Sequence, residues 1–577
     1  MKTNDPFSME ISRLVWETRY RVAGEADIRA SWQRVAQAIA QAEGDQHAQW
    51  ADRFTTLLDG FRFLPAGRIL AGAGSGHHVT LFNCFVMGEI ADDLEHIFEA
   101  LKEGALTMQQ GGGVGYDFST LRPAGMVAAA TGTIASGPVS FMYIWDAMCA
   151  TMLSTGARRG AMMATLRCDH PDIETFVDAK RDPAVLRHFN VSVLVTDAFM
   201  AAVADDADWP LVFPGLAATR TLKARALWQR ILRAAYDTAE PGVLFVDTIN
   251  RDNTLASLET LSATNPCGEI PLPPYGACDL GSLNLTAFVT APFSPEARLD
   301  LDALAAATRL AVRFLDNVID VSRYPLPAQA GEARSKRRIG LGVTGLADAL
   351  VLLGHRYDSE DARQLAAQAM QTLRDAAYRA SVELAHEKGV FPAFARDAFL
   401  ASGFARRLPD DIREAIAANG LRNSHLLAIA PAGTISLLAN NCSSGIEPIF
   451  AGEAERRVLQ PDGSYRTHAV LDYALQRWRA QGNSGVPPTF VEARQLDPLA
   501  HLAMQATLQP YVDNAISKTI NVAADMPFER FADLYRQAHA LGLKGCTVFR
   551  PNAVTGAILS EPAAERVQCC GIEREAD

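Results

Sequence analysis

The segment Asn265-Pro266-Cys267-Gly268-Glu269-Ile270-Pro271-Leu272-Pro273-Pro274-Tyr275-Gly276-Ala277-Cys278 decides how the rest of the chain is interpreted. Its prolines and glycines are incompatible with a helix and unfavourable in a central strand. Because Asn265 precedes a proline, we expect an extended backbone, in which alternate residues lie on one face. The sequence therefore predicts that the amide of Asn265, the thiol of Cys267 and the carboxylate of Glu269 face the same way, at steps of roughly 6.6 Å.

This combination of side chains is typical of an active site, although each part also has a plainer interpretation. A segment rich in proline and glycine is commonly a surface loop, and an isolated cysteine is commonly a small buried hydrophobic residue. A carboxylate and an amide beside a thiol, however, place a base and a hydrogen-bonding group next to a reactive sulfur. We interpret the segment as a candidate catalytic loop.

Composition narrows the classes of protein that fit. The chain has 577 residues, of which 49% are hydrophobic, so we expect one large core with appended pieces or two to four domains. The net charge of -12 argues against a nucleic-acid polymer as partner, but not against single nucleotides. No apolar run approaches the ~18 residues of a membrane span, and the first residues do not resemble a secretory signal. Nine scattered cysteines do not suggest a disulfide framework, so we expect a cytoplasmic protein.

Further blocks of sequence accompany the candidate catalytic loop in a characteristic order. They are LPAGRIL at 64–70, NCFV at 83–86, GGGVGY at 111–116, GSLNL at 281–285, RRIGLG at 337–342, APAGTIS at 430–436 and GIEP at 445–448. Over about residues 60–552 the chain resembles the large chains of ribonucleotide reductases, and most closely their adenosylcobalamin-dependent class. The order of the blocks makes the resemblance specific.

The resemblance implies a fold and a division of the chain. It implies a ten-stranded α/β barrel of two parallel five-stranded halves, with the catalytic loop as a central finger and a small helical region before it. We expect an N-terminal helical region at 1–66, the barrel at 67–552 and a mobile tail at 553–577. Only about sixty residues precede the first block, so an additional ATP-cone domain is not expected.

Hydrophobic periodicity predicts individual helices independently of the resemblance. Amphipathic runs lie at 28–43 and near 54–61, and longer alanine- and leucine-rich helices are expected at 301–322 and 361–389. Strands that alternate with such helices are typical of parallel βα units.

The resemblance also implies roles for the candidate catalytic residues. Cys267 would carry a thiyl radical, Glu269 would act as general base on the 3′-hydroxyl, and Asn265 would orient the ribose. Cys84 and Cys278 would form the redox pair that donates hydrogen and closes into a disulfide, so their Cα atoms are expected within about 7 Å. Cys569 and Cys570 of the tail would carry electrons inward from thioredoxin or glutaredoxin by thiol–disulfide exchange.

Two further sites follow from the same resemblance. The glycine cluster at 111–115 lets the backbone approach a ligand closely, although it can also be an ordinary flexible turn. The segment at 430–436 is predicted to begin a helix whose free N–H groups bind phosphate, although it can also be an ordinary capped helix. The implied substrate-binding residues are Asn83, Gly112, Gly113, Ala432, Gly433, Thr434 and Ile435. The implied effector-binding residues are Asp92, Arg122 and Arg159, although apolar residues at 126–130 stand where some reductases have a second arginine.

The source of the radical is inferred from what the chain lacks. The segment CTVFR at 546–550 has no tyrosine pair of the kind used with a metal-containing partner subunit. Glycyl-radical reductases lack an equivalent of Glu269. Adenosylcobalamin is therefore the expected cofactor, and the absence of an Asp-x-His-x-x-Gly motif suggests that it binds with its own base attached.

The predicted function is the radical reduction of ribonucleotides, preferably diphosphates over triphosphates, to 2′-deoxyribonucleotides. Expected partners are the ribonucleotide substrate, a deoxynucleotide or ATP effector, the thiol reductant and a second copy of the chain in a homodimer. Two alternatives remain open: the large subunit of a two-subunit metal-dependent reductase, and a catalytically silent nucleotide-binding barrel. A zinc protein using Cys569 and Cys570 is a weaker idea, because no second cysteine or histidine pair accompanies them.

Overall fold

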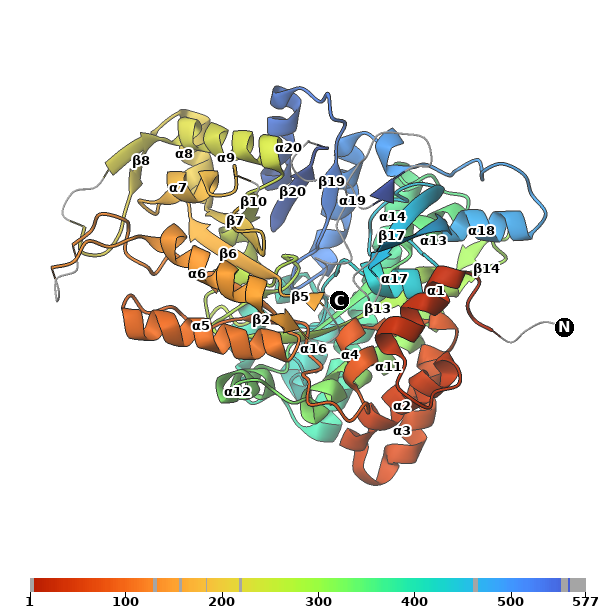
Figure 1. Cartoon of the computed structure of the whole chain (residues 1–577). Helices are drawn as coiled ribbons and strands as arrows, with labels where there is room; N and C mark the ends of the chain where they lie inside the picture. The colour runs from red at the N-terminus through yellow and green to blue at the C-terminus, as the bar shows by residue number, and fades with distance from the viewer. Residues whose placement is uncertain are drawn as a thin grey trace.

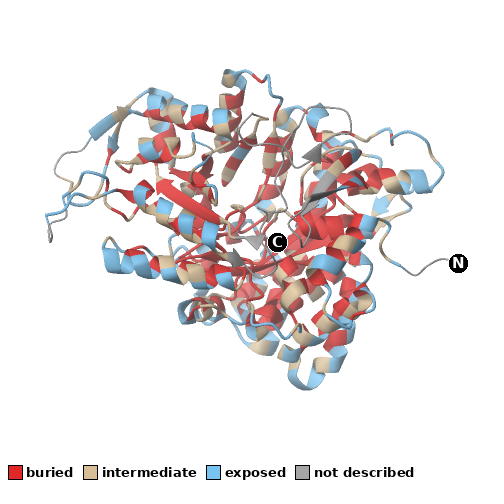
Figure 2. Cartoon of the chain, in the orientation of Figure 1, coloured by how far each residue is buried: buried red, intermediate tan, exposed pale blue. Residues whose placement is uncertain are grey.

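The structure is a computed structural model that describes residues 5–127, 132–154, 158–182, 184–216, 220–459, 465–551 and 559–560. A central sheet is surrounded by helices, and a cluster of N-terminal helices lies at one end of it (Figure 1). Buried residues concentrate in the sheet and on the helix faces that cover it (Figure 2). No helix in these ranges is long and apolar enough to cross a membrane.

The N-terminal helices are α1 (Glu10–Val15), α2 (Ile28–Ala40), α3 (His47–Leu58) and α4 (Gly67–Gly72). Helix α2 starts where the Asp27 side chain accepts the Ala30 N–H, and its buried residues recur at helical spacing. The predicted run at 28–43 is thus confirmed, whereas α3 begins earlier than the run expected at 54–61. Helices α2 and α3 pack against α11 (Leu301–Val321) of the main domain (Figure 1).

Five parallel strands form one half of the ten-stranded sheet. In spatial order they are β2 (Cys84–Val86), β3 (Gly113–Asp117), β6 (Met162–Arg167), β7 (Phe189–Val195) and β10 (Gly242–Phe245). Almost all their residues are buried, as is typical of parallel strands covered on both faces. This arrangement matches one predicted half of the barrel.

The second half is less regular. It contains β1 (Phe63–Pro65), β13 (Ala277–Asn284), β16 (Ile339–Thr344), β19 (Thr519–Asn521) and β20 (Gly545–Phe549). Strand β13 is parallel to β16 and antiparallel to β1 and β2, while β20 is parallel to β19 and antiparallel to β10.

Between β16 and β19 the ladder is reduced to two isolated parallel bridges, Leu341–Leu427 and Ile429–Ile516. The described residues therefore form a mixed α/β sheet whose ladder is open at this point. The prediction of a ten-stranded α/β sheet is confirmed, but its closure into a barrel is not seen, because the segments around Leu427 and Ile516 make single bridges rather than strands.

Long helices cover the sheet close to their predicted positions. Helix α11 matches the prediction at 301–322, and α14 (Glu360–Lys388) matches the prediction at 361–389. Asp300 and Ser359 cap their N-termini through side-chain oxygens. The other helices of eight or more residues are α5 (Leu94–Gln109), α6 (Pro138–Thr151), α8 (Asp197–Asp205), α9 (Ala224–Thr238), α12 (Pro327–Lys336), α16 (Asp410–Asn419), α18 (Tyr473–Ala480), α19 (Pro498–Leu508) and α20 (Phe528–Ala540).

Short helices and small strands connect the longer elements. The short helices are α7 (Ile173–Asp178), α10 (Val246–Asp252), α13 (Leu346–Leu352), α15 (Arg396–Ala401) and α17 (Gly433–Leu438). The small strands are β4 (Leu153–Ser154), β5 (Arg158–Arg159), β8 (Asp208–Leu211), β9 (Arg220–Lys223), β11 (Ala263–Thr264), β12 (Pro271–Leu272), β14 (Val289–Thr290), β15 (Arg298–Leu299), β17 (Glu453–Leu459), β18 (Tyr465–Leu471) and β21 (Leu559–Ser560).

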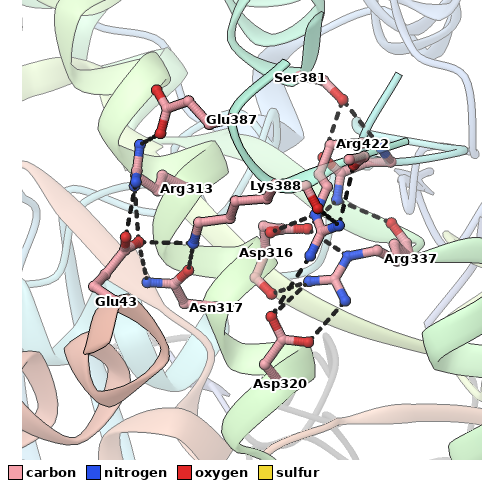
Figure 3. A network of polar contacts seen from close by, with 12 residues as sticks. Glu43, Arg313, Asp316, Asn317, Asp320, Arg337, Ser381, Glu387, Lys388 and Arg422 are labelled. Atoms are coloured by element: carbon pink, nitrogen blue, oxygen red, sulfur yellow. Dashed lines mark hydrogen bonds and ion pairs between the residues drawn. The ribbon is translucent and has the colours of Figure 1, made fainter. Parts of the chain in front are cut away.

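A buried polar network joins the N-terminal helices to the main domain (Figure 3). Glu43, in the short 3-10 helix Gln41–Gln46 between α2 and α3, accepts hydrogen bonds of 2.8 and 2.7 Å from Arg313 of α11. It also accepts from Asn317 at 2.8 Å and from Lys388 of α14 at 2.9 Å. Since the side chain of Glu43 is only 3% exposed, these donors compensate its buried charge and fix the position of the helical region.

Candidate active site

The candidate catalytic loop is the tip of a small hairpin. Strands β11 and β12 pair antiparallel, and the loop 265–270 joins them. The Asn265 N–H donates to the Ile270 carbonyl at 3.3 Å, and the Gly268 N–H donates to the Asn265 carbonyl at 3.1 Å. The prediction of an extended chain is wrong at this point, because these bonds close a tight turn that the positive φ of Gly268 (82°) permits.

Cys267 lies at the tip of this hairpin and faces a cavity of about 390 Å³. Its neighbours Pro266 and Gly268 also line the cavity, as do Pro431 and Gly433 from the predicted phosphate segment. Cys267 is half-buried, whereas Cys84 and Cys278 are fully buried and do not line the cavity. The three thiols therefore differ in access: one reaches the cavity and the two buried ones do not.

Cys84 and Cys278 are directly opposite each other on the antiparallel strands β2 and β13. Such cross-strand pairs have Cα atoms about 4.5–5.5 Å apart, so the expectation that the two Cα atoms lie within about 7 Å is confirmed. Both cysteines are free in the structure. Burial raises the pKa of each thiol well above its ordinary value, which keeps the S–H bonds intact.

Asn265 and Glu269 both contact one member of this pair, Cys84. The Asn265 side chain donates through Nδ2 to Cys84 Sγ at 3.2 Å and accepts the Ile270 N–H at 3.1 Å. Glu269 Oε1 lies 4.0 Å from Cys84 Sγ, and its other oxygen has no hydrogen-bond partner. Burial raises the pKa of Glu269 to about 7, so its carboxyl group changes protonation near neutral pH.

The glycine cluster makes room for the hairpin. A Cβ atom at Gly115 would lie 1.8 Å from the Thr264 carbonyl oxygen, and one at Gly113 would lie 3.2 Å from the Pro266 ring. Gly112 lies instead against Phe85, where a Cβ would be 2.6 Å from the ring. Gly113 and Gly115 therefore bring β3 and the hairpin closer than larger residues allow.

Other predicted substrate-binding residues carry polar atoms without partners. Both polar atoms of the Asn83 amide and the Thr434 hydroxyl are buried and make no hydrogen bond. Thr434 lies in α17, which begins at Gly433 as the sequence predicts, after Ala432; Ile435 follows and is buried. Buried polar atoms without partners are costly, and a bound polar ligand satisfies them.

Two of the predicted effector residues, Asp92 and Arg122, do not line the cavity. Arg122 donates to Asp92 through Nε at 2.6 Å, so these two residues form an ion pair with each other. Arg159 lies in β5, and its side chain is outside the described part of the structure. Cys569 and Cys570 of the tail also lie outside the described residues.

Sequence reasoning missed two contributors to the site. Gly115 belongs to a block that we interpreted as a ligand-binding turn, yet it serves the packing of the hairpin. Asn190 of β7 lines the cavity, and its Nδ2 donates to the Pro266 carbonyl at 2.8 Å. A polar residue inside the apolar strand at 189–195 was the available signal. In the described residues no group of three metal-ligating side chains comes together.

Comparison with known families agrees with this geometry. A family model described as "Ribonucleotide reductase, barrel domain" matches residues 82–549. A second, described as "Ribonucleotide reductase, all-alpha domain", matches residues 7–78. The boundary between the two matches falls just before the strand that carries Cys84.

Individual relatives are similar over most of their length. A vitamin B12-dependent ribonucleoside-diphosphate reductase of Mycobacterium tuberculosis is 41% identical over 551 residues, covering 92% of this chain and 76% of the relative. The protein of that name from Thermoplasma acidophilum is 38% identical, covering 91% and 68%. The ribonucleoside-diphosphate reductase large subunit of vaccinia virus is 27% identical, covering 89% and 72%. The chain therefore belongs to the family of vitamin B12-dependent ribonucleotide reductases.

Proposed function

We propose that the chain reduces ribonucleoside diphosphates to 2′-deoxyribonucleoside diphosphates in a reaction that depends on vitamin B12 in its adenosylcobalamin form. The observation that carries this function is the placement of three thiols. Cys267 faces the cavity, and the directly paired Cys84 and Cys278 are buried outside it, with Asn265 and Glu269 in contact with Cys84. One thiol is thus available for radical chemistry and two for reduction.

The cavity leaves Cys267, and neither Cys84 nor Cys278, open to a cofactor that must reach one thiol alone. Such a group can approach Cys267 from the cavity, while burial keeps it away from Cys84 and Cys278. Polar groups along the wall suit the amide side chains of a corrin; they include Ser192, Thr519, Asn521 and Thr547. When bound, adenosylcobalamin supplies the organic radical that takes the hydrogen atom of a thiol.

The protein's own residues then divide the reaction among them. Cys267, as a thiyl radical, removes the 3′ hydrogen atom of the ribose and later returns it. Glu269 accepts the proton of the 3′-hydroxyl, which weakens the 2′ C–O bond. Cys84 and Cys278 supply two protons and two electrons, so the 2′-hydroxyl leaves as water and the thiols close into a disulfide. One ribonucleotide and two thiols thus give one deoxyribonucleotide, one disulfide and one water.

The unpartnered polar atoms suit a bound nucleotide. Asn83, whose carbonyl accepts the Gly113 N–H, can bond ribose hydroxyls through its amide side chain. Thr434 can bond the diphosphate through its hydroxyl, together with the N–H groups of residues 432, 434 and 435; the Gly433 N–H donates to the Pro431 carbonyl. Gly112 and Gly113 keep this region compact.

The proposed function also includes an effector site, a homodimer and a thiol pair that carries electrons to the active site. Asp92, Arg122 and Arg159 are proposed to bind a deoxynucleotide or ATP effector, with Asp92 and Arg122 released from their mutual ion pair. Helix α5 exposes Leu94, Phe98 and Leu106 along one side, a stripe suited to the interface of a homodimer. Cys569 and Cys570 are proposed to pass electrons from thioredoxin or glutaredoxin to Cys84 and Cys278.

The proposal also includes the closure of the sheet into a barrel. The segments around Leu427 and Ile516 make isolated parallel bridges in the gap between β16 and β19. We propose that these segments close the ten-stranded sheet into a barrel around the hairpin. This closure supports the function, because it shields a radical at Cys267 from solvent.

Turnover by the purified chain tests the function. The protein is incubated with a ribonucleoside diphosphate, adenosylcobalamin and dithiothreitol, without a second protein, and deoxyribonucleotide is measured by chromatography. Product is expected, and none is expected with a cobalamin that lacks the adenosyl group. A requirement for a second, metal-containing protein would favour the two-subunit alternative. Binding of substrate and cofactor without any product would favour the silent barrel.

A further inference from the structure

One side chain from a neighbouring strand holds the tip of the catalytic hairpin. Asn190 is the second residue of β7, and its Nδ2 donates to the carbonyl oxygen of Pro266 at 2.8 Å. That carbonyl belongs to the peptide group that joins Pro266 to Cys267. Because a peptide group is planar and rigid, a hydrogen bond to its oxygen fixes the orientation of the whole plane and of the Cα atom of Cys267.

The rest of the turn is fixed from other directions. The Ala515 N–H donates to the Glu269 carbonyl at 2.9 Å, on the far side of Cys267. Gly113 of β3 lies against the ring of Pro266, and the Gly268 N–H bonds back to the Asn265 carbonyl. Asn190 completes this set from β7, on the N-terminal side of Cys267, so the residue that faces the cavity lies between two anchored peptide groups.

The surroundings of Asn190 argue against a purely structural origin. Asn190 is only partly buried and shares its face of β7 with Ser192, a second polar residue of the cavity wall. The buried apolar residues Phe189, Val191 and Val193 alternate with it and lie on the other face of the strand. The amide also lines the same cavity as Cys267. An apolar side chain at this position fills the strand equally well but makes no bond to the hairpin.

We propose that Asn190 is a positioning residue that aims the thiol of Cys267 into the cavity by holding the Pro266–Cys267 peptide. Its effect on turnover rests on the proposed reductase function, whereas its effect on the thiol does not. Without the bond the peptide plane is free to rotate, and the sulfur spends less time in the orientation that hydrogen transfer needs. Misplacement by about 1 Å is enough to slow a reaction about 100-fold.

Two variants separate positioning from packing. Asn190→Asp keeps the shape, but its carboxylate cannot donate and repels the Pro266 carbonyl; Asn190→Ala removes the group altogether. For each variant, kcat and KM are measured with adenosylcobalamin, and the alkylation rate of Cys267 by iodoacetamide is measured by mass spectrometry without the cofactor. We expect kcat to fall about 10- to 100-fold with KM within about twofold. The alkylation rate should rise about threefold or more as the tip loosens.

The matched control is Asn317→Asp, which disturbs a buried asparagine of the network in Figure 3 and no residue of the cavity. It should lower thermal stability while the alkylation rate of Cys267 and the kcat of the folded protein stay at wild-type values. Wild-type kcat and alkylation rates in both Asn190 variants would overturn the proposal, as would changes no larger than those of the control. If Asn190→Asp fails to fold, Asn190→Ala decides. A wild-type protein without reductase activity contradicts the proposed function, but the alkylation comparison still decides the role of Asn190.

Discussion

At the scale of single residues, the site contains several buried polar atoms without partners. Asn83, Glu269 and Thr434 each carry at least one, although most buried polar atoms in folded proteins are hydrogen-bonded. The sequence blocks identified these three residues by type and order. Their unsatisfied state was not predictable, because it depends on which atoms surround them after folding.

Glu269 gives the first prediction at this scale. Its pKa, raised to about 7 by burial, means that the carboxylate needed as a base is lost below neutral pH. We expect kcat/KM to fall as the pH drops through about 7, and Glu269→Gln to lower kcat by about 10²- to 10⁴-fold and to remove this dependence. The measurement is a pH profile of deoxynucleotide formation for both proteins.

Stability provides the control for that prediction. A carboxyl group whose pKa is raised by folding costs stability when it ionises, so the wild type loses stability as the pH rises from ~4.3 towards 7 and the glutamine variant does not. Glu269→Gln should therefore unfold in urea at pH 8 no more easily than the wild type. If the variant is both inactive and much less stable than the wild type, a folding defect and not the loss of the base explains the lost activity.

At the scale of elements, helices were predicted better than the catalytic hairpin. Helices α11 and α14 agree with their predicted ranges almost to the residue, since their length and apolar periodicity are local properties. The loop 265–270 was expected to be extended from its prolines. It turns instead, because hydrogen bonds across the hairpin, including that of Ile270 to the Asn265 side chain, outweigh the local preference.

The contact between β3 and the hairpin is tested by Gly115→Ala. The added Cβ would lie 1.8 Å from the Thr264 carbonyl oxygen, which is backbone and must move with the hairpin. We expect a loss of about 1–3 kcal/mol in the free energy of unfolding and a fall in kcat, measured by urea unfolding and turnover.

Gly331→Ala in α12 is the matched control, since no atom lies within 4 Å of its added Cβ. This change should stabilise the protein by about 0.5–1 kcal/mol through helix propensity and leave kcat unchanged. Equal effects of the two substitutions would contradict the close approach of β3 and the hairpin.

At the scale of the whole molecule, the decisive contacts join residues far apart in the sequence. Cys84 and Cys278 meet through the pairing of β2 with β13, which composition and periodicity do not encode. The family resemblance predicted this pair, and the structure confirms that the two positions are adjacent. The strand order near Leu427 and Ile516 could not be predicted from local sequence patterns either. The segments there make only single bridges, which produce little periodic signal in the sequence.

The attachment of the N-terminal helices depends on Glu43. Burial alone would raise its pKa, but the donors Arg313, Lys388 and Asn317 outweigh burial and lower the pKa to about 2. Glu43→Ala leaves those cations buried without their partner, so we expect a loss of about 3–5 kcal/mol in the free energy of unfolding, measured with urea at pH 7. The loss should shrink as the pH falls from ~4.3 towards 2, because the wild-type carboxylate becomes protonated there.

An exposed ion pair between α11 and α14 serves as control for that change. Arg309 and Glu383 are paired at 2.6 Å but remain 46% and 54% exposed. Glu383→Ala should therefore cost less than about 1 kcal/mol. A cost for Glu43→Ala as small as this would contradict the role of the buried network in holding the helical region.

The proposed reaction depends on the thiol of Cys267, because this group lines the cavity and forms the radical that starts reduction of the nucleotide. The most direct test is deoxynucleotide formation by Cys267→Ala with a saturating ribonucleoside diphosphate, adenosylcobalamin and dithiothreitol. We predict product no higher than the background without enzyme, from a protein that unfolds at the wild-type temperature. Deoxynucleotide formed at a rate near that of the wild type would contradict the account.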